Sequence, residues 1–594
     1  FGRRPALAQR IAAGAAGLTL LLAIGAGAAV WVGDGGIKTW GSVPTGWIPV
    51  EIAVRADPLG LTFAVLVAAV AFGVQVYSAA ALRTDRRYGS YAAAVSLLTA
   101  AMLLVVLAED VVLLLAGWVL LSASSALLVG HHWDVPGVGR AAVRALVVPY
   151  LGDAALLIGL FVLARQAGSF RVSAIASDVE SSTAHTVAAV LVLCGVAGKA
   201  AQVPLHVWLP ASAAAPVPAS ALVNSATTVA AGAFLVARFY EVFLAAPVAL
   251  AVLAVVASVT MVLAALAAVA EDDLTRVLAW SSASQLGFVL GGLAVGGYAA
   301  GLFHLVGHAA LKALLFLAAG ALAYTAGSTL LSRLGGLAGS MRPTYRAATL
   351  GFAALAGVPP LVGFFSKDSV LAAAEQAAGG RGPVPVWAAG LVLAAALLTI
   401  MLTAVYTVRA WLVAFHGPPT QAGAQRLPSA MRLPLLGLSA GVVVLGAVGL
   451  VASGAFARGG GEAPGAQLNW ATSLLSLVLL AGGGSAAYSA WIRQAQRDPV
   501  AVLGERPRAA LAAGLRLEEL YGAAVVRPVY GLSRLVAAGD RVVLHPYVTA
   551  AGRITRALGA LPQVAQSGRV QSYVTAVLAF VVVLVVTGAV VALA

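Results

Sequence analysis

The chain has 594 residues, of which 61% are hydrophobic and only 10% are charged. A soluble protein carries about 25% charged residues, so this composition excludes a soluble globular fold. The formal net charge of +14 does not indicate a nucleic-acid partner, because an excess of arginine and lysine is typical of the cytoplasmic loops of membrane proteins.

Apolar segments of 18 or more residues recur along the whole chain, and each is long enough to cross a bilayer. The sequence therefore predicts an all-α polytopic membrane protein with about fifteen transmembrane helices. These helices are expected near residues 10–32, 59–82, 90–108, 110–130, 141–165, 184–203, 218–240, 246–269, 279–296, 299–324, 347–365, 385–413, 433–453, 468–490 and 572–594.

Residues 493–570 form a long polar segment that is rich in arginine and contains short apolar runs. The positive-inside rule predicts that this segment is cytoplasmic and that the C-terminus lies outside in a multi-pass protein. The composition, rich in alanine, glycine, arginine and valine with little lysine, is typical of a high-GC bacterial genome, so the expected location is a bacterial inner (plasma) membrane. The pattern favours an amphipathic helix lying laterally along the membrane or along partner subunits, and a plain cytoplasmic loop is the alternative. Pro528 and Pro546 are expected to interrupt such a helix.

Six regions are predicted along the chain. They are N-terminal transmembrane helices (1–108), a first repeat (109–270), a second repeat (271–415), additional transmembrane helices (416–492), the basic lateral region (493–570) and a final anchoring helix (571–594).

An ionisable residue within a spanning helix is costly, by about 2.5–3.5 kcal/mol for a charge at the bilayer centre, and therefore suggests a function. The candidates in or directly after the apolar stretches are Asp153, Lys199, His304, His308, Lys312 and Lys367. The spacing of four places His304, His308 and Lys312 on one helix face. Histidine titrates near neutral pH and burial disfavours the charged form of lysine, so this stripe is interpreted as a proton relay. Metal binding, which would require a third ligand, or a structural hydrogen-bond stripe is the alternative.

Prolines interrupt two of the spans next to a lysine. Pro204 and Pro210 follow Lys199, and Pro359 and Pro360 precede Lys367. Paired interruptions of this kind are typical of inverted-repeat transporters, in which a broken helix opens space for water at membrane depth. His206 is interpreted either as a relay residue or as an interfacial histidine, and Trp208 as an interfacial anchor.

Several stretches together resemble the antiporter-like membrane subunits of respiratory complex I, most closely the L (chain 5) type, which is related to Mrp-type cation/proton antiporters. The stretches are DPLGLTF at 57–63, GKAAQVPLHVWLP at 198–210, DDLTRVLAWSSASQLGF at 272–288, FHLVGHAALKALLFLAAG at 303–320 and GFFSKD at 363–368. The resemblance runs from about residue 10 to 594, and no counterpart of the family's first spanning helix is expected in this sequence.

The resemblance implies a proton-translocating subunit of an NADH:quinone oxidoreductase. Lys199 matches the lysine of the family's first broken helix, Lys367 that of the second, and Asp153 the aspartate of the family's preceding GD motif. His304, His308 and Lys312 match the central relay. The resemblance also implies that NADH, flavin, iron–sulfur clusters and quinone are bound by other subunits. This chain is expected to bind no cofactor or metal, and to contact antiporter-like neighbours, the lipid bilayer and protons.

The sequence departs from the family where the partners of the first lysine are expected. The usual glutamate falls on Val119, an arginine on Tyr150 and a histidine on Asn224. We therefore hypothesise that Asp153 replaces the glutamate as the partner of Lys199, or that this half-channel is impaired. A subunit of a stand-alone Mrp-type antiporter or of an inorganic-carbon uptake complex, or a structural paralog that does not conduct, is the alternative.

Overall fold

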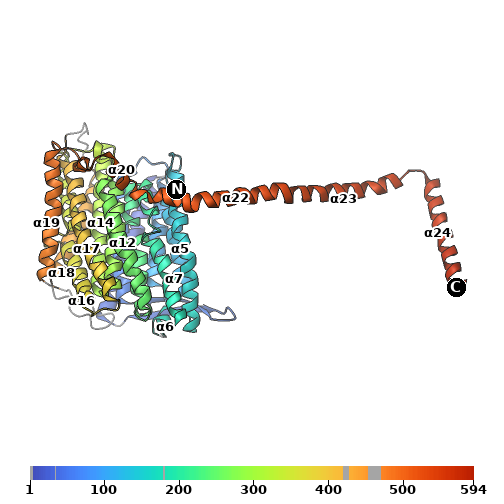
Figure 1. Ribbon diagram of the computed structural model, residues 1–594, viewed down its shortest axis with the longest axis horizontal. Helices are drawn as coiled ribbons and strands as arrows, with labels where there is room; N and C mark the ends of the chain where they lie inside the picture. Colours follow the sequence, from blue (N-terminus) through green and yellow to red (C-terminus); the bar gives the residue numbers. More distant parts are fainter. Residues whose placement is uncertain (1–4, 34, 178–180, 419–426, 452–469, 594) are drawn as a thin grey trace. The chain divides into compact units, whose positions relative to one another are not determined.

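The computed structural model describes residues 5–33, 35–177, 181–418, 427–451 and 470–593, and it is almost entirely helical (Figure 1). The chain divides into two units, Phe1–Arg516 and Leu517–Ala594. Within the described residues, thirteen helices are long and apolar enough to cross a membrane. This confirms an all-α polytopic membrane protein.

The first unit contains the helices α1 (Pro5–Val32), α2 (Pro58–Ala81), α3 (Tyr88–Leu107), α4 (Val111–Val129), α5 (Val138–Gln166), α6 (Val172–Ser177), α7 (Thr183–Lys199), α8 (Trp208–Ala211), α9 (Val217–Val223), α10 (Thr228–Arg238), α11 (Tyr240–Leu244), α12 (Pro247–Ala270), α13 (Leu274–Ala294), α14 (Tyr298–Ala326), α15 (Arg342–Ala356), α16 (Val362–Ala378), α17 (Val386–Trp411), α18 (Ser429–Val451), α19 (Trp470–Arg493) and α20 (Glu505–Ala512). The second unit contains α21 (Leu517–Tyr521), α22 (Arg527–Gly539), α23 (His545–Ala565) and α24 (Val570–Leu593).

The two predicted spans that lie next to a lysine are interrupted rather than continuous, and the span expected at 218–240 is divided between α9 and α10. The span expected at 184–203 is the 17-residue α7, which ends at Lys199. The span expected at 347–365 falls on α15 and α16, separated by residues 357–361. We call residues 200–207, between α7 and α8, the first break and residues 357–361 the second break. Each contains an X–Pro peptide bond in the cis form, at Val203–Pro204 and at Pro359–Pro360.

Aspartates begin three of the spanning helices. Asp57 accepts a hydrogen bond from the backbone N–H of Gly60 at the start of α2 (2.7 Å). Asp110 and Asp273 do the same for the first turns of α4 and α13. A side-chain oxygen at this position satisfies one of the N–H groups that lack a partner in the first turn. The starts of these helices are therefore determined by capping aspartates as well as by hydropathy.

A β-hairpin differs from the all-α prediction. Strand β1 (Gly36–Val43) pairs antiparallel with β2 (Val50–Ala56), with Gly36 opposite Ala56 and Val43 opposite Val50. The turn contains Gly46 at a positive φ of 82°, which a residue without a Cβ adopts at no steric cost. The hairpin lies between α1 and α2 and contains no long apolar run, so a search for spanning segments does not detect it.

The centre of the first unit is formed by helices that are buried on every side. The most apolar windows of residues 217–238, 274–294 and 298–326 are completely buried within the chain. A helix enclosed on all sides can hold polar groups away from lipid. The histidines and Lys312 lie on α14, which belongs to this central group.

The ion pair between Arg409 and Asp498 connects the end of the first unit to its core. The buried Arg409 guanidinium donates to both carboxylate oxygens of Asp498 (2.7 and 2.8 Å) and to the carbonyl oxygen of Glu271 (2.7 Å). Burial is the largest single influence and would raise the pKa of the Asp498 carboxyl, but the hydrogen bonds and charge of Arg409, together with the N–H of Val500 and the charge of Arg508, lower that pKa overall. The segment that follows α19 is therefore attached to α12 and α17.

The second unit is helical through both prolines that were expected to interrupt it. Pro528 and Pro546 each stand in the first turn of a helix, α22 and α23. A π-helical turn precedes each of them, over Gly522–Val526 and Asp540–Leu544. The prediction of interruption was wrong, because a helix can accept proline in its first turn, where an N–H group is not needed.

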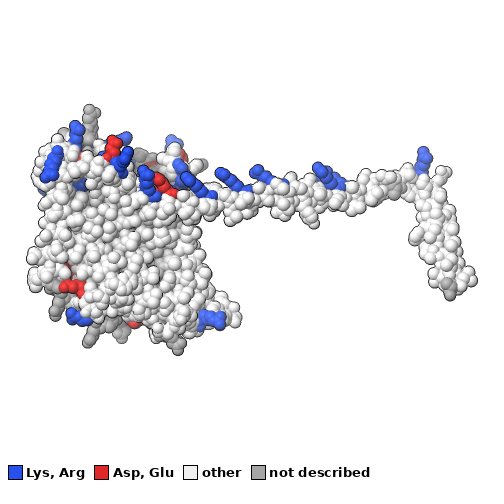
Figure 2. Space-filling model, viewed as in Figure 1, with Lys and Arg blue, Asp and Glu red and all other residues white. Residues whose placement is uncertain are grey.

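Basic side chains follow one side of α22 and α23 (Figure 2). Arg527, Arg534 and Arg541 are spaced by seven residues, which is close to two helical turns. This agrees with the amphipathic character predicted for the segment, whereas its lateral placement along the membrane or along partner subunits stays a prediction. The unit ends in α24, an apolar helix of 24 residues that has no buried residue within the described chain.

Candidate functional site

Lys199 lies in the last turn of α7, immediately before the first break, and its side chain is 0% exposed. Its ammonium Nζ lies 2.8 Å from Asp153 Oδ2 on α5 and 2.5 Å from Ser122 Oγ on α4. The same Nζ lies 5.0 Å from the centre of the Trp118 ring. A buried ammonium group requires this kind of pairing, because removal of a charge from water is costly.

Asp153 is held on both of its carboxylate oxygens. Oδ2 contacts Lys199, and Oδ1 accepts a hydrogen bond from the Trp118 indole Nε1 (2.7 Å). Trp118 and Ser122 are four residues apart on α4, so they share the helix face that meets Lys199. Asp153 therefore contacts Lys199, as the hypothesis that it replaces the usual glutamate requires. The role of this contact in proton transfer stays a prediction.

The positions of the missing family residues lie away from this contact or are occupied by neutral groups. Val119 is 46% exposed on the outside of the chain. Its neighbour Trp118, by contrast, is fully buried on the face that meets Asp153. Asn224 is buried at the end of α9 and donates to the carbonyl oxygen of Ser220 (3.0 Å).

Side chains satisfy backbone groups around the first break. The Trp208 indole donates to the carbonyl oxygen of Gly198 (2.8 Å), and Thr260 Oγ1 accepts from the N–H of Val203 (3.0 Å). Trp208 is fully buried, so the prediction of an interfacial anchor was wrong. Its indole lies inside the protein because the last carbonyls of the broken helix α7 lack partners within the helix and require a hydrogen-bond donor. His206 is also buried, which contradicts the interfacial alternative for this residue.

The stripe on α14 is buried in full. His304 Nδ1 lies 2.9 Å from Ser366 Oγ on α16, and Lys312 Nζ donates to the carbonyl oxygen of Leu278 on α13 (2.9 Å). Both ring nitrogens of His308 are buried without a hydrogen-bond partner among the described residues. A buried polar atom without a protein partner is rare and indicates a functional role or an exchangeable partner such as water.

Lys367 lies in the second turn of α16, after the second break. Its Nζ donates to the carbonyl oxygen of Leu355 (2.6 Å) and lies 3.5 Å from that of Ala356, both in the last turn of α15. These carbonyls have no partner within their own helix and form the negative end of its dipole. The lysine therefore occupies a position where partial negative charge is concentrated.

Three of the four lysines of the chain are these buried residues, and the fourth is Lys38 in β1. Of the three, Lys199 is paired with a carboxylate. In the part of the chain that the structure describes, Lys312 and Lys367 have no carboxylate oxygen within ion-pair distance, and carbonyl oxygens are their hydrogen-bond acceptors.

Sequence reasoning missed several residues that contact this series. Ser122 and Ser366 are neutral residues in apolar helices, where serine gives little signal. Asp368 is buried beside Lys367, and both of its oxygens accept from Ser473 Oγ on α19 (2.9 and 2.8 Å). Its carboxyl group directly after Lys367, in the GFFSKD stretch, was the signal that could have identified it.

The fold and these buried charges define a polytopic membrane subunit of the antiporter-like class. A sequence profile described as NADH:quinone oxidoreductase/Mrp antiporter, transmembrane region, matches residues 108–394. The NADH-quinone oxidoreductase subunit L of Mycobacterium tuberculosis strain H37Rv is 31% identical over 525 residues, which cover 85% of this chain and 80% of the relative. Subunit L of Pseudomonas aeruginosa is 34% identical over 387 residues, covering 64% of this chain and 61% of the relative.

Solved structures show the same fold. The Mrp complex from Dietzia sp. DQ12-45-1b contains a chain that is 26% identical, with a TM-score of 0.73, covering 99% of this chain and 63% of that one. An archaeal membrane-bound sulfane sulfur reductase has a similar chain at 22% identity and a TM-score of 0.65. The protein thus belongs to the family of antiporter-like membrane subunits that NADH:quinone oxidoreductase shares with Mrp antiporters, which confirms the resemblance predicted from its motifs.

Proposed function

We propose that this chain is the L-type, proton-translocating membrane-arm subunit of an NADH:quinone oxidoreductase. Family membership and the subunit L relatives support this class of function. The observation that carries the proposal is the series of three buried lysines, at both breaks and on the central helix α14, in a chain with only four lysines. Buried ionisable groups in spanning helices are costly and are kept for ion or proton transfer.

In the proposed pathway, the first break admits water to Lys199, and Asp153 stabilises the ammonium form of that lysine. Protons then pass to Lys312, His308 and His304 on α14, and finally to Lys367 at the second break. His304 is connected to α16 through Ser366, one residue before Lys367. The nitrogens of His308 that lack a protein partner support this role, because a relay group must exchange its donor and acceptor positions.

The chemistry that drives this movement is proposed to lie on other subunits. NADH, flavin, iron–sulfur clusters and quinone would be bound there, and this chain would bind none of them. The relatives are parts of multi-subunit membrane complexes. We propose that residues 493–570 contact the antiporter-like neighbours in such a complex, with α24 as the terminal anchor.

The proposed location is a bacterial inner membrane, with residues 493–570 on the cytoplasmic side and the C-terminus outside. Arginines support this orientation, because they lie at the helix ends that this orientation places on the cytoplasmic side. These are Arg83 and Arg87 between α2 and α3, Arg276 in the first turn of α13, Arg342 in that of α15 and Arg493 in the last turn of α19.

A subunit of a stand-alone Mrp-type antiporter is the second candidate. The structural match to the Mrp complex extends over 99% of this chain, which favours that alternative. In both candidates the same lysine series moves the proton, and the source of energy differs.

The test is proton translocation by the purified complex in sealed lipid vesicles. We expect NADH oxidation to acidify or alkalinise the vesicle interior in the wild type, and the Lys312→Met variant to lose this signal while NADH oxidation by the other subunits continues. Lys38→Met is the matched control and keeps the signal. Translocation driven only by a sodium gradient would favour the Mrp alternative, and undiminished translocation in Lys312→Met would overturn the proposed pathway.

A further inference from the structure

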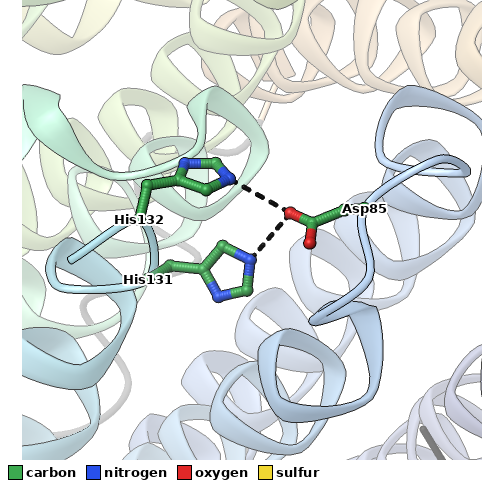
Figure 3. Close-up of side chains that lie close together, drawn as sticks. All are labelled: Asp85, His131 and His132. Atoms are coloured by element: carbon green, nitrogen blue, oxygen red, sulfur yellow. Dashed lines mark hydrogen bonds and ion pairs between the residues drawn. The ribbon is translucent and has the colours of Figure 1, made fainter. Parts of the chain in front are cut away.

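Two imidazoles and one carboxylate converge at the turns that follow α2 and α4. Asp85 lies between α2 and α3, and His131 and His132 lie between α4 and α5. The Nε2 atoms of His131 and His132 lie 2.9 Å and 3.1 Å from the same oxygen, Oδ2 of Asp85 (Figure 3). The three potential ligand atoms all lie within 4.8 Å of one another.

This spacing suits a tetrahedral metal ion. Zinc binds nitrogen and oxygen ligands at about 2.0–2.1 Å, so ligand atoms of a tetrahedral site lie about 3.3 Å apart. The two observed Nε2–Oδ2 distances are shorter than this by a few tenths of an ångström. Small side-chain movements would therefore place a cation between the three atoms, where it would replace the imidazole protons.

Neighbouring groups fix the orientation of these side chains. The backbone N–H of Arg87 donates to the other oxygen of Asp85, Oδ1 (2.7 Å), which leaves Oδ2 for the imidazoles. The Arg87 guanidinium donates to the carbonyl oxygen of His131 (3.2 Å) and to Asp134 Oδ1 (2.6 Å), so its charge is paired. The Tyr91 ring packs edge-on against His131. Outer groups of this kind orient the ligands of metal sites.

The cluster is open to solvent on one side only. Asp85 and His131 are largely buried, whereas the His132 side chain is 39% exposed. Solvent therefore reaches one side of the cluster, where a water molecule would complete the coordination.

We infer that Asp85, His131 and His132 form a binding site for a divalent transition-metal cation of the zinc type, which joins the α2–α3 turn to the α4–α5 turn. Two imidazoles with one carboxylate favour zinc and its neighbours in the periodic table over calcium and magnesium, which prefer oxygen ligands. This inference revises the sequence-based expectation that the chain has no metal site. The metal alternative was considered there only for the α14 histidines.

The experiment is a titration of the purified, chelator-washed complex with zinc chloride, followed by metal analysis and by the thermal unfolding midpoint of this subunit. We expect one more zinc ion per complex in the wild type than in His131→Ala/His132→Ala. A ligand that binds only the folded state raises the unfolding midpoint, so zinc should raise it in the wild type and not in the variant. His416→Ala, which removes a histidine in the turn after α17, is the matched control and should bind like the wild type.

A gentler variant keeps the test decisive if the double variant fails to assemble. His132→Gln changes the most exposed ligand, and we expect it to weaken zinc binding by roughly tenfold or more. Magnesium chloride at the same concentration should not raise the unfolding midpoint. Equal zinc content in the wild type and both variants, or a zinc effect that His132→Gln leaves unchanged, would overturn the inference and leave a plain hydrogen-bonded cluster.

Discussion

At the first break the lysine precedes the interruption and contacts a carboxylate, whereas at the second break the lysine follows the interruption and contacts carbonyl oxygens. Lys199 is paired with Asp153, and an indole, that of Trp208, donates to the carbonyl of Gly198. At the second break no indole is needed, because the Lys367 ammonium itself donates to the last turn of α15. The two breaks therefore satisfy the same backbone requirement with different groups.

This difference has a consequence for charge. A full negative charge on Asp153 stabilises the ammonium form of Lys199 more strongly than the partial charges of a helix end stabilise that of Lys367. In the proposed pathway, Lys367 would release a proton without breaking an ion pair, whereas Lys199 would keep its proton until the charge of Asp153 is compensated. This difference supports uptake at the first break and release at the second as parts of the proposal.

The largest effect is expected at the second break. Lys367→Gln retains a donor for the Leu355 carbonyl but cannot carry a proton. A positioned proton-transfer group contributes roughly 100-fold or more, so proton translocation should fall to near background while the complex still assembles. Vesicle acidification measures the loss, and Lys38→Gln serves as control. Translocation near the wild-type rate would show that the two breaks are not parts of one pathway.

The next largest effect is expected for the partner of Lys199. Asp153→Asn removes a charged hydrogen bond worth about 1.5–3 kcal/mol, so translocation should fall roughly tenfold or more. Val119→Glu should not restore it, because Val119 lies on the outside of the chain. The comparison is Asp153→Asn against Val119→Glu/Asp153→Asn in the same vesicles. Recovery in the double variant would show that the family position, not Asp153, faces Lys199.

A smaller effect is expected for the hydroxyl beside Lys199. Ser122→Ala removes one hydrogen bond and leaves the ion pair in place. At about 1 kcal/mol, this loss should slow translocation roughly fivefold. Ser124→Ala on the same helix, whose hydroxyl donates within its own helix, is the control. A loss as large as that of Asp153→Asn would mean that the hydroxyl, rather than the carboxylate, controls the first break.

The smallest effect on transport is expected for Trp208→Phe. This variant leaves the Gly198 carbonyl without its donor, which should lower the free energy of unfolding by about 1–3 kcal/mol. The thermal unfolding midpoint should fall accordingly. Translocation should change less than twofold, because Trp208 carries no proton. A normal midpoint with lost translocation would instead give Trp208 a part in the pathway.

Much of this arrangement could be predicted from the sequence, because lipid imposes strict rules. Apolar runs must span as helices, so the spans could be located, and buried charges stand out against them. Lys199, Lys312 and Lys367 were identified in this way. The hypothesis that Asp153 replaces the glutamate as the partner of Lys199 agrees with their 2.8 Å contact.

The rest depends on packing between distant segments. Trp208 is a residue type that is common at membrane interfaces, yet its position is determined by a hydrogen bond to a carbonyl ten residues earlier. Pro528 and Pro546 suggest interruption, yet local π turns place each proline at a helix start. Asp85 and His131 are 46 residues apart and meet only because two helix turns lie side by side. Sequence periodicity contains no signal for such contacts.

The most direct test of the first-break account is a double-mutant cycle on Lys199 and Asp153, measured as the thermal unfolding midpoint of the purified complex. Removing one partner of a buried ion pair costs about 3–5 kcal/mol, whereas replacing both leaves no uncompensated charge. We expect Lys199→Met and Asp153→Asn each to lower the midpoint clearly, and the double variant to recover most of the loss. A double variant whose loss equals the sum of the two single losses would contradict the pairing on which the account rests.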